Sequence, residues 1–379
     1  MLYTIKSSGS SHNISDSFYI KRVYMKKHRK KVLAALIFVL AAGFISIINF
    51  RNTSAPGTSA RGNIILDSKE FSKTSEVVVI PPRKKVTIVT SDDANWDSFV
   101  PEKMNKNFRG LFTGKRKVSL SPFAMAQYPV TQELFEKIMG YNPSHFKNEN
   151  LGDKYFSSCP DENPILRPVE TVTWFEGIVF CNRLTEYLMK KSDCVYYSDS
   201  EYKNIYTLED SKARIFPVVT QSKKGYRLPT ETEWEFAARG AVYQNAEWFN
   251  SFSGTNTDSL SDVRNIKNTL FTDKNLDKYG WYRGNSNGMT HETGTKLPNA
   301  IGLYDMSGNV WEWLYDWYDY DIEDGKVDNP TGAKTGSSRV LRGGSWFDPA
   351  YDCLVTRRFN NIHPYISHFY FGFRYCRNL

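Results

Sequence analysis

The cysteines and histidines are the residues of this chain best suited to redox or metal chemistry. The six histidines form neither HExxH nor HxH, and no two cysteines form CxxC, so the sequence predicts no zinc ribbon and no histidine-based metal site. The cysteines are scattered and odd in number: Cys159, Cys181, Cys194, Cys353 and Cys376. If the protein is exported, at least one thiol therefore stays unpaired or pairs with another molecule.

A second candidate for chemistry is the segment 305–312, which reads DMSGNVWE. Asp305 and Glu312 place a carboxylate at each end, and Gly308 permits a tight turn that points backbone carbonyls inward. Calcium prefers about six to eight hard oxygen ligands of these two kinds. The residues therefore suit a calcium site, and a solvated acidic turn is the alternative that they leave open.

The third candidate is the stretch GGSWFDPAYDC at 343–353, which combines a hydroxyl, a carboxylate and a thiol at Ser345, Asp348 and Cys353. Tryptophans are concentrated nearby, and they are most simply core residues, although partly exposed members would line a groove. They are Trp311, Trp313, Trp317 and Trp346.

Three helices with clear start signals are expected to position these segments. One begins at Thr131 and ends at Gly140. The other two begin at capping boxes, a Thr followed three residues later by Glu, at 173–176 and 230–233. Gly240 ends the last of them. After residue 240, frequent Asn, Gly, Asp and Ser indicate long loops between short strands. The predicted fold is α+β, irregular and low in regular secondary structure.

Composition and charge limit the classes of function. The chain has 379 residues, 40% of them hydrophobic and 15% aromatic, which excludes a wholly disordered or collagen-like protein. The formal net charge is +8, and residues 1–31 contribute +7 of it, with eight basic residues and one acid. The rest of the chain is nearly neutral, so we expect no nucleic-acid partner.

The N-terminal part resembles a membrane anchor. Residues 32–50 form 19 uncharged and mostly apolar positions, roughly 28 Å as a helix, which is long enough to cross a bilayer. The basic flank before them predicts a cytoplasmic N-terminus and an extracytoplasmic remainder, periplasmic or extracellular. The alternative is a signal peptide that starts at Met25 and is cleaved to give a secreted protein.

The expected organisation therefore has four parts. A basic cytoplasmic leader spans 1–31, and a transmembrane anchor or signal segment spans 32–50. A linker with short strands within 77–90 spans 51–104, and one domain spans 105–379.

An ordered series of motifs in the predicted domain resembles the formylglycine-generating enzyme family, also called sulfatase-modifying factor domains. The motifs are MAQYPVTQELFEKIMGYNPSHF (125–146), RPVETVTWFEGIVFCNRLTE (167–186), YRLPTETEWEFAARG (226–240), GTKLPNAIGLYDMSGNVWEWLYDWY (294–318), RVLRGGSWFDPAYDC (339–353) and FGFR (371–374). The resemblance implies a C-type-lectin-like α+β fold with a shallow peptide groove and bound calcium. Carried over position by position, it makes Asp305 and Glu312 side-chain ligands of a structural calcium ion, with carbonyls from Gly308 and Val310.

The resemblance also defines a catalytic expectation. Oxidases of this family bind Cu(I) between two cysteines five residues apart after the GGS motif, and they convert a sulfatase cysteine to formylglycine. Cys353 matches the second cysteine, and Ser345 and Trp311 match positions that line the active groove. Asp348 stands at the first cysteine position, and a carboxylate is a poor ligand for Cu(I), so we do not expect copper.

Two functions stay open at this point. One is a membrane-tethered binding or scaffold module that recognises a protein or peptide ligand, such as a sulfatase. The other is an oxidase of sulfatase cysteine that works with a modified site.

Overall fold

The computed structural model describes residues 77–80, 84–89, 105–112, 116–147, 159, 161–242, 251–255, 272–322, 324–360 and 362–379. The chain divides into two units, Met1–Arg61 and Gly62–Leu379, and all described residues belong to the second. The predicted leader and span therefore lie outside the described residues, as does most of the predicted linker. Within the ranges given above, no helix is both long enough and apolar enough to cross a membrane.

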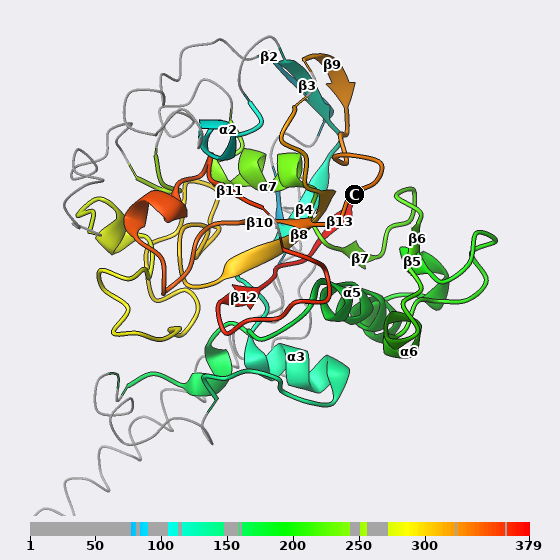
Figure 1. The fold of residues 1–379 in the computed structure, drawn as a ribbon, viewed down its shortest axis with the longest axis horizontal. Helices are drawn as coiled ribbons and strands as arrows, with labels where there is room; N and C mark the ends of the chain where they lie inside the picture. The colour runs from blue at the N-terminus through cyan, green and yellow to red at the C-terminus, as the bar shows by residue number, and fades with distance from the viewer. Residues whose placement is uncertain are drawn as a thin grey trace, which may run out of the picture. The chain divides into compact units, whose positions relative to one another are not determined.

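Helices are few, and the three predicted ones are confirmed (Figure 1). Thr131 caps α3 and Gly140 ends it in a left-handed conformation, with φ of 85°. Capping boxes at Thr173–Glu176 and Thr230–Glu233 start α5 and α7. The described α-helices are α2 (Asn105–Phe108), α3 (Gln132–Met139), α5 (Trp174–Leu188), α6 (Leu208–Lys212) and α7 (Glu231–Ala238). Short 3₁₀-helices are η4 (Pro164–Leu166), η5 (Lys191–Asp193), η8 (Leu276–Lys278) and η9 (Ala350–Cys353).

The strands are short and form four small sheets among the described residues. One contains β1 (Val77–Val79), β4 (Phe123–Ala126), β13 (Cys376–Asn378) and β7 (Tyr226–Arg227) in that order. A second contains β11 (Arg358–Phe359), β10 (Arg339–Arg342), β8 (Trp311–Trp317) and β12 (Phe371–Gly372). The others are β2 (Val86–Val89) with β3 (Arg116–Leu120) and β9 (Gly325–Asp328), and β5 (Tyr196–Tyr197) with β6 (Val218–Val219). The predicted class, α+β with few helices, is confirmed.

The two short strands expected within 77–90 form, and both pair with strands of the main domain. β1 lies antiparallel to β4, and β2 lies antiparallel to β3. The paired part of the chain therefore begins before residue 105, where the predicted domain starts.

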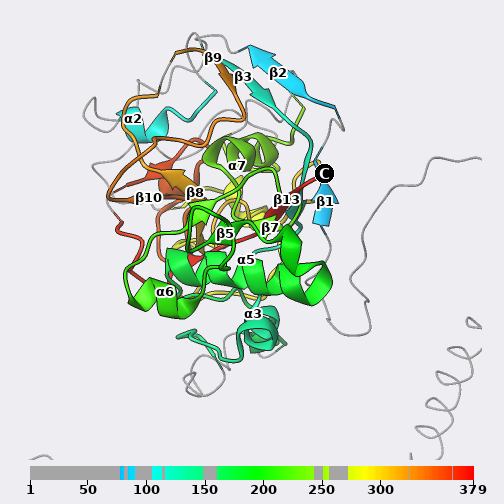
Figure 2. The same ribbon diagram turned by 90° about the vertical axis from the view of Figure 1, so that its right-hand side faces the viewer.

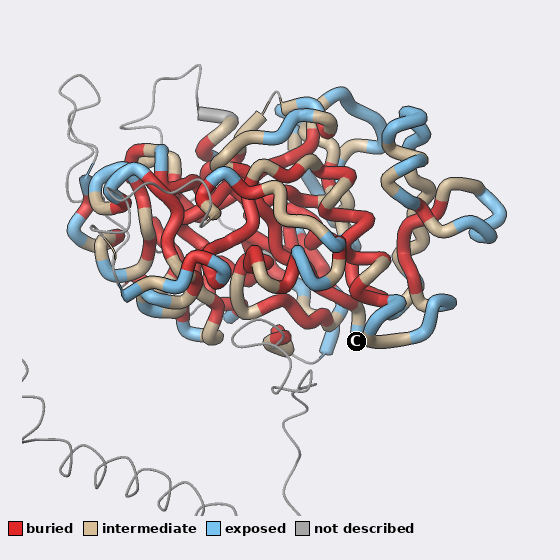
Figure 3. Tube along the Cα trace, turned by 90° about the horizontal axis from the view of Figure 1, so that it is seen from below, coloured by how far each residue is buried: buried red, intermediate tan, exposed pale blue. Residues whose placement is uncertain are grey.

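Strand β8 separates two hydrophobic cores. Trp311 and Trp313 pack in the cluster around α5, whereas Leu314 packs with Trp234 and Phe236 of α7. This division follows the two-residue period of a strand, whose side chains alternate between faces. Figures 1 and 2 show α7 and α5 on opposite sides of β8, and Figure 3 shows buried residues concentrated along the central segments. β8 and the GGS turn after β10 thereby come to lie in the middle of the domain.

Candidate functional site

Three of the residues singled out from the sequence come together at the start of β8. Trp311 Nε1 donates a hydrogen bond to Asp348 Oδ2 at 2.7 Å, and Ser345 Oγ donates to the same oxygen. The indole and the hydroxyl are buried, whereas Asp348 is half-buried. The structure therefore brings together two predicted groove residues and the aspartate at the first cysteine position.

The GGS turn holds this arrangement through a close backbone approach. Gly343 and Gly344 both have positive φ, 97° and 74°, a conformation that favours glycine. A Cβ atom on Gly344 would lie 2.5 Å from Cys353 Sγ, so the turn packs directly on η9. Two adjacent glycines are thus required for Ser345 to reach Asp348.

Asp348 is an unusual acid in this position. Burial, together with the negative charge of Asp352, raises its pKa to about 7, although the bonds from Ser345 and Trp311 favour the charged form. The carboxyl group is thus half-protonated near neutral pH. Such a group can accept or donate hydrogen bonds to a ligand, depending on pH.

Cys353 is inaccessible. Its side chain is fully buried in an apolar cluster with Phe252, Leu276, Tyr282 and Leu354, and its pKa is raised well above the usual value by burial and by Asp348 and Asp352. Cys376 lies in a different cluster, where its Sγ accepts a hydrogen bond from Arg227 Nη1 at 2.9 Å. No disulfide joins any of the five cysteines, all of which the structure describes. A buried thiol beside a carboxylate does not fit the two-thiolate site that Cu(I) requires.

The predicted calcium ligands have partners within the chain. Glu312 is fully buried: its Oε1 accepts from Arg374 Nη2 at 2.7 Å, and its Oε2 accepts from Arg374 Nε and Trp234 Nε1, each at 2.7 Å. Asp305 Oδ2 accepts from the backbone of Gly294 at 2.8 Å. The backbone of Gly308 and Val310 continues from this turn into β8. A calcium ion would have to share or replace these partners, so the calcium site stays a prediction.

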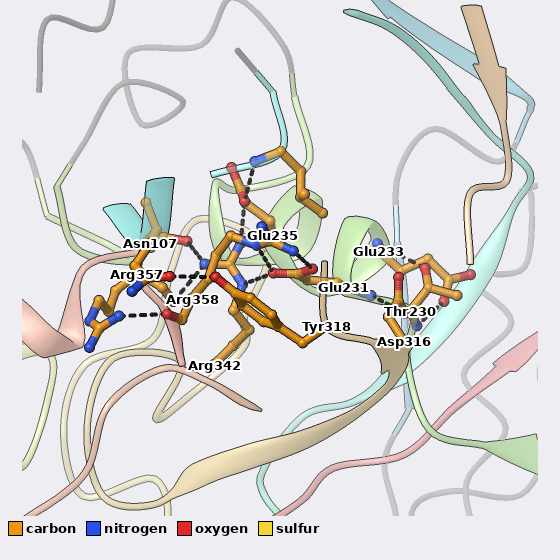
Figure 4. A network of polar contacts seen from close by, with 12 residues as sticks. Asn107, Thr230, Glu231, Glu233, Glu235, Asp316, Tyr318, Arg342, Arg357 and Arg358 are labelled. Atoms are coloured by element: carbon orange, nitrogen blue, oxygen red, sulfur yellow. Dashed lines mark hydrogen bonds and ion pairs between the residues drawn. The ribbon is translucent and has the colours of Figure 1, made fainter. Parts of the chain in front are cut away.

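A polar network that the sequence motifs did not indicate runs from α7 to the strands beside it (Figure 4). Glu231 accepts two hydrogen bonds from Arg358, at 2.7 and 2.8 Å, and Glu235 pairs with Arg342. Although burial alone would raise it, the charge of Arg358 holds the pKa of Glu231 below its usual range. Spacing along the sequence could not show this network, because Glu231 and Arg358 are 127 positions apart.

The network borders a cavity of about 650 Å³ lined by Arg116, Asp316, Asp319, Arg358 and neighbouring residues. Asp316 accepts a hydrogen bond from the backbone of Glu231 at 2.8 Å. Burial and the charge of Glu231 raise the pKa of Asp316 to about 8. The carboxyl group is therefore largely neutral at pH 7, which reduces its repulsion from the buried glutamates of α7.

Phe347, the residue before Asp348, is an exposed aromatic. Phe347 is 45% exposed, and its ring stacks on that of Tyr370 with centroids 5.9 Å apart. The guanidinium carbon of Arg283 lies 5.6 Å from the centroid of the Phe347 ring. The Arg283 backbone N–H also donates to Asp348 O at 2.9 Å. An exposed aromatic ring beside a half-buried acid and a cation forms a surface suited to a peptide-like ligand.

Comparison with known proteins agrees with this fold and with these motifs. The model of the family described as "Sulfatase-modifying factor enzyme 1-like domain" matches residues 67–379. The chain belongs to this family. The matched range includes β1 and β2, in keeping with their pairing inside the domain.

Individual relatives carry different names. The chain is 30% identical over 254 residues to the chaperone protein LppX of Paenibacillus barcinonensis, covering 61% of this chain and 71% of that protein. It is 34% identical over 237 residues to the formylglycine-generating enzyme of Mus musculus, of which it spans 59%, with 61% of this chain covered. Among solved structures it is similar to Treponema denticola variable protein 1, with 31% identity, a TM-score of 0.59, and 81% and 99% of the two chains covered.

Proposed function

We propose that residues 62–379 act as an extracytoplasmic binding module that residues 32–50 tether to a membrane, without copper-dependent oxidation. The observation that carries this proposal is the position of Asp348 and the hydrogen bonds that its carboxylate accepts. Its carboxylate stands at the first cysteine position of the family oxidases and is held by Trp311 and Ser345. The groove residues therefore orient an oxygen acid where the oxidase needs a sulfur.

The environment of Cys353 supports the same conclusion. Cu(I) binds thiolates, and burial with two nearby carboxylates keeps this thiol protonated at neutral pH. A single buried thiol leaves the ion without a second soft ligand. The alternative function, oxidation of a sulfatase cysteine, would need this side chain to become accessible and charged.

The ligand that fits best is a peptide or protein segment, with a sulfatase as one example. Phe347 offers an exposed apolar anchor, the guanidinium of Arg283 lies 5.6 Å from the centroid of its ring, and the neighbouring Asp348 offers a hydrogen-bonding group. One relative is named a chaperone, which is a function of protein binding rather than of redox chemistry. Family membership alone does not decide between the two functions, because one fold supports many sites.

A peptide assay tests the proposal. A synthetic peptide with a CxPxR motif is incubated with the purified chain under oxygen with added Cu(I), and its mass is followed. We expect no conversion to the aldehyde by the natural protein. We expect Asp348→Cys to bind Cu(I) more tightly, because it restores a second sulfur, whether or not turnover returns.

Binding of the same peptide is measured by fluorescence anisotropy, with Phe347→Ala as the variant and Tyr202→Ala, another exposed aromatic, as the matched control. Weaker binding in Phe347→Ala alone would support the proposed surface. Conversion by the natural protein that disappears in Cys353→Ala would overturn the proposal and establish the oxidase.

A further inference from the structure

A cysteine, a glutamate and a histidine converge next to the hydrophobic cluster that contains Trp346. Cys159, Glu162 and His291 each offer one ligand atom, and these atoms lie within 4.8 Å of one another. The Glu162 N–H donates to the Cys159 carbonyl at 3.2 Å, which keeps these two residues close together. His291 comes from a segment 132 positions away from the cysteine.

The thiol and the carboxylate approach the same nitrogen of the imidazole. Cys159 Sγ lies 3.8 Å and Glu162 Oε1 lies 2.7 Å from His291 Nδ1. In a catalytic relay the nucleophile and the acid use opposite ring nitrogens, so this cluster is not arranged as a Cys–His–Glu triad. The three ligand atoms instead lie within 4.8 Å of one another, close enough to surround one metal ion.

The second imidazole nitrogen is already fixed. His291 Nε2 lies 2.7 Å from the carbonyl oxygen of Ser286, where it donates a hydrogen bond. Histidines that bind metals commonly donate their other N–H to a carbonyl or carboxylate, which leaves the ligating nitrogen with a lone pair. This contact therefore leaves Nδ1 as the nitrogen that a metal would bind, once the proton that it shares with Glu162 Oε1 has left.

The ring is also held rigidly in place. His291 is fully buried and stacks on Trp281 with centroids 3.8 Å apart and planes 16° apart. Lys296 lies 3.8 Å from the centroid of the same indole. The Asn309 side chain accepts from His291 N at 3.1 Å and donates to His291 O at 3.0 Å. A histidine that is already held by ring packing and by hydrogen bonds to its backbone needs little reorganisation when it binds a metal.

The two carboxylate oxygens of Glu162 have different partners. Oε2 accepts from Arg167 Nη2 at 3.1 Å and from the Glu292 N–H at 3.3 Å, while Oε1 points to the histidine. A metal ion can therefore take Oε1 without removing the contacts that orient the carboxylate.

We propose that Cys159 Sγ, Glu162 Oε1 and His291 Nδ1 bind a zinc-class divalent cation, with water or a ligand atom in a fourth position. A tetrahedral zinc with bonds of about 2.0–2.3 Å keeps its ligand atoms roughly 3.4–3.6 Å apart. The distance of 3.8 Å between Cys159 Sγ and His291 Nδ1 is close to this range. The distance of 2.7 Å between His291 Nδ1 and Glu162 Oε1 would lengthen when the ion replaces the proton that these two atoms share. Binding releases the thiol proton and this shared proton, and the thiolate and carboxylate then balance the charge of the cation.

The site lies next to the turn that carries Ser345. Cys159 packs on the cluster of Phe146, Met289 and Trp346, and Ser286 Oγ donates to the Trp346 carbonyl at 2.7 Å. A bound cation would link Cys159 and Glu162 to the segment of His291, which precedes β8. This site is independent of the proposed function, because neither Asp348 nor Cys353 takes part in it.

Metal titration tests the inference. The full-length chain, purified in detergent under reducing conditions and stripped with chelator, is titrated with ZnCl₂ and separately with CoCl₂. We expect one tightly bound equivalent of zinc, a rise in melting temperature, and a near-ultraviolet charge-transfer band for cobalt that only a thiolate ligand produces. Cys159→Ser should abolish the band and weaken zinc binding at least about tenfold, since a ligand is lost.

Two further variants keep the test decisive. Glu162→Gln retains an oxygen for Arg167 but loses the charge, so it should also weaken zinc binding. Cys194→Ser alters a buried thiol elsewhere and should leave both the band and the affinity unchanged. The inference is overturned if no stoichiometric zinc binds, or if the cobalt band persists in Cys159→Ser.

Discussion

At the scale of single residues, Asp348 defines how this chain departs from the oxidases that it resembles. Sequence comparison placed the aspartate at a cysteine position, and the structure adds that Trp311 and Ser345 both donate to it. The same contacts that would position a copper ligand therefore position an acid. Because burial raises its pKa to about 7, this acid changes charge in the physiological range.

The raised pKa predicts a pH-dependent cost in stability. The folded pKa lies above the ordinary value of 3.8, so the folded state holds this proton more tightly than the unfolded state. The resulting stabilisation is complete below about pH 4 and is lost as the pH rises through 7. Asp348→Asn cannot ionise and keeps an oxygen for Trp311 and Ser345. Its free energy of unfolding, relative to the natural protein, should increase by roughly 2–4 kcal/mol between pH 4.5 and 7.5.

Urea denaturation at the two pH values measures this difference. Asp324→Asn, at an exposed position, serves as the control and should show no such change. A difference between Asp348→Asn and the natural protein that does not vary with pH would contradict the raised pKa.

Sequence could anticipate part of the site at this scale and not the rest. Ser345, Trp311 and Asp348 were indicated by short motifs whose local geometry is largely set by glycines. A buried thiol at Cys353 could also be expected, but its surroundings could not, because residues such as Phe252 and Tyr282 pack around it from other parts of the chain. Cys159 and His291 match no spacing pattern, since tertiary folding alone brings them together across 132 positions.

At the scale of secondary-structure elements, buried polar contacts connect β8 with α7 and with the segment after β12. Glu312 in β8 pairs with Arg374, which follows β12, and also accepts from Trp234 in α7. The starts of α3, α5 and α7 were predictable because a cap is a local signal of a few residues. The strand pairings were not, because β8 lies beside β12 and β10 through contacts between distant segments.

We predict that Glu312→Gln destabilises the domain by about 3–5 kcal/mol, because it leaves the buried guanidinium of Arg374 without a compensating charge. Urea denaturation is carried out in chelator and again in excess calcium, and the loss should appear in both. The matched control is Glu209→Gln in α6, where an exposed pair with Lys212 should contribute about 0–1 kcal/mol.

The same measurement bears on the predicted calcium site. If Glu312 acted mainly as a calcium ligand, the natural protein would be more stable in calcium than in chelator, and Glu312→Gln would remove that difference. A loss of stability confined to the calcium buffer would contradict the ion pair as the main role of this residue. It would support calcium at Asp305 and Glu312 instead.

At the scale of the whole molecule, the chain combines a family domain with a basic, apolar N-terminal part. The family match begins at residue 67, and the described strands from Val77 onward pair within the domain. Net charge supports the same division, because +7 of the total +8 lies within residues 1–31. The domain itself is nearly neutral, so its electrostatics come from local groups such as Asp348 and the buried pairs of α7.

The distribution of charge predicts the topology of the chain. A cluster of lysines and arginines directly before an apolar span stays in the cytoplasm, because moving it across the membrane is unfavourable and the span is oriented accordingly. Residues 51–379 should then face the extracytoplasmic side. A reporter that is active only outside the cytoplasm, fused after Leu379, should be active, and a reporter that needs the cytoplasm should not. Replacing the seven basic residues of 21–31 with Ser or Gln should reduce the first signal and raise the second. Activity of the cytoplasmic reporter alone in the natural chain would contradict the extracytoplasmic location, because it would place residues 51–379 in the cytoplasm.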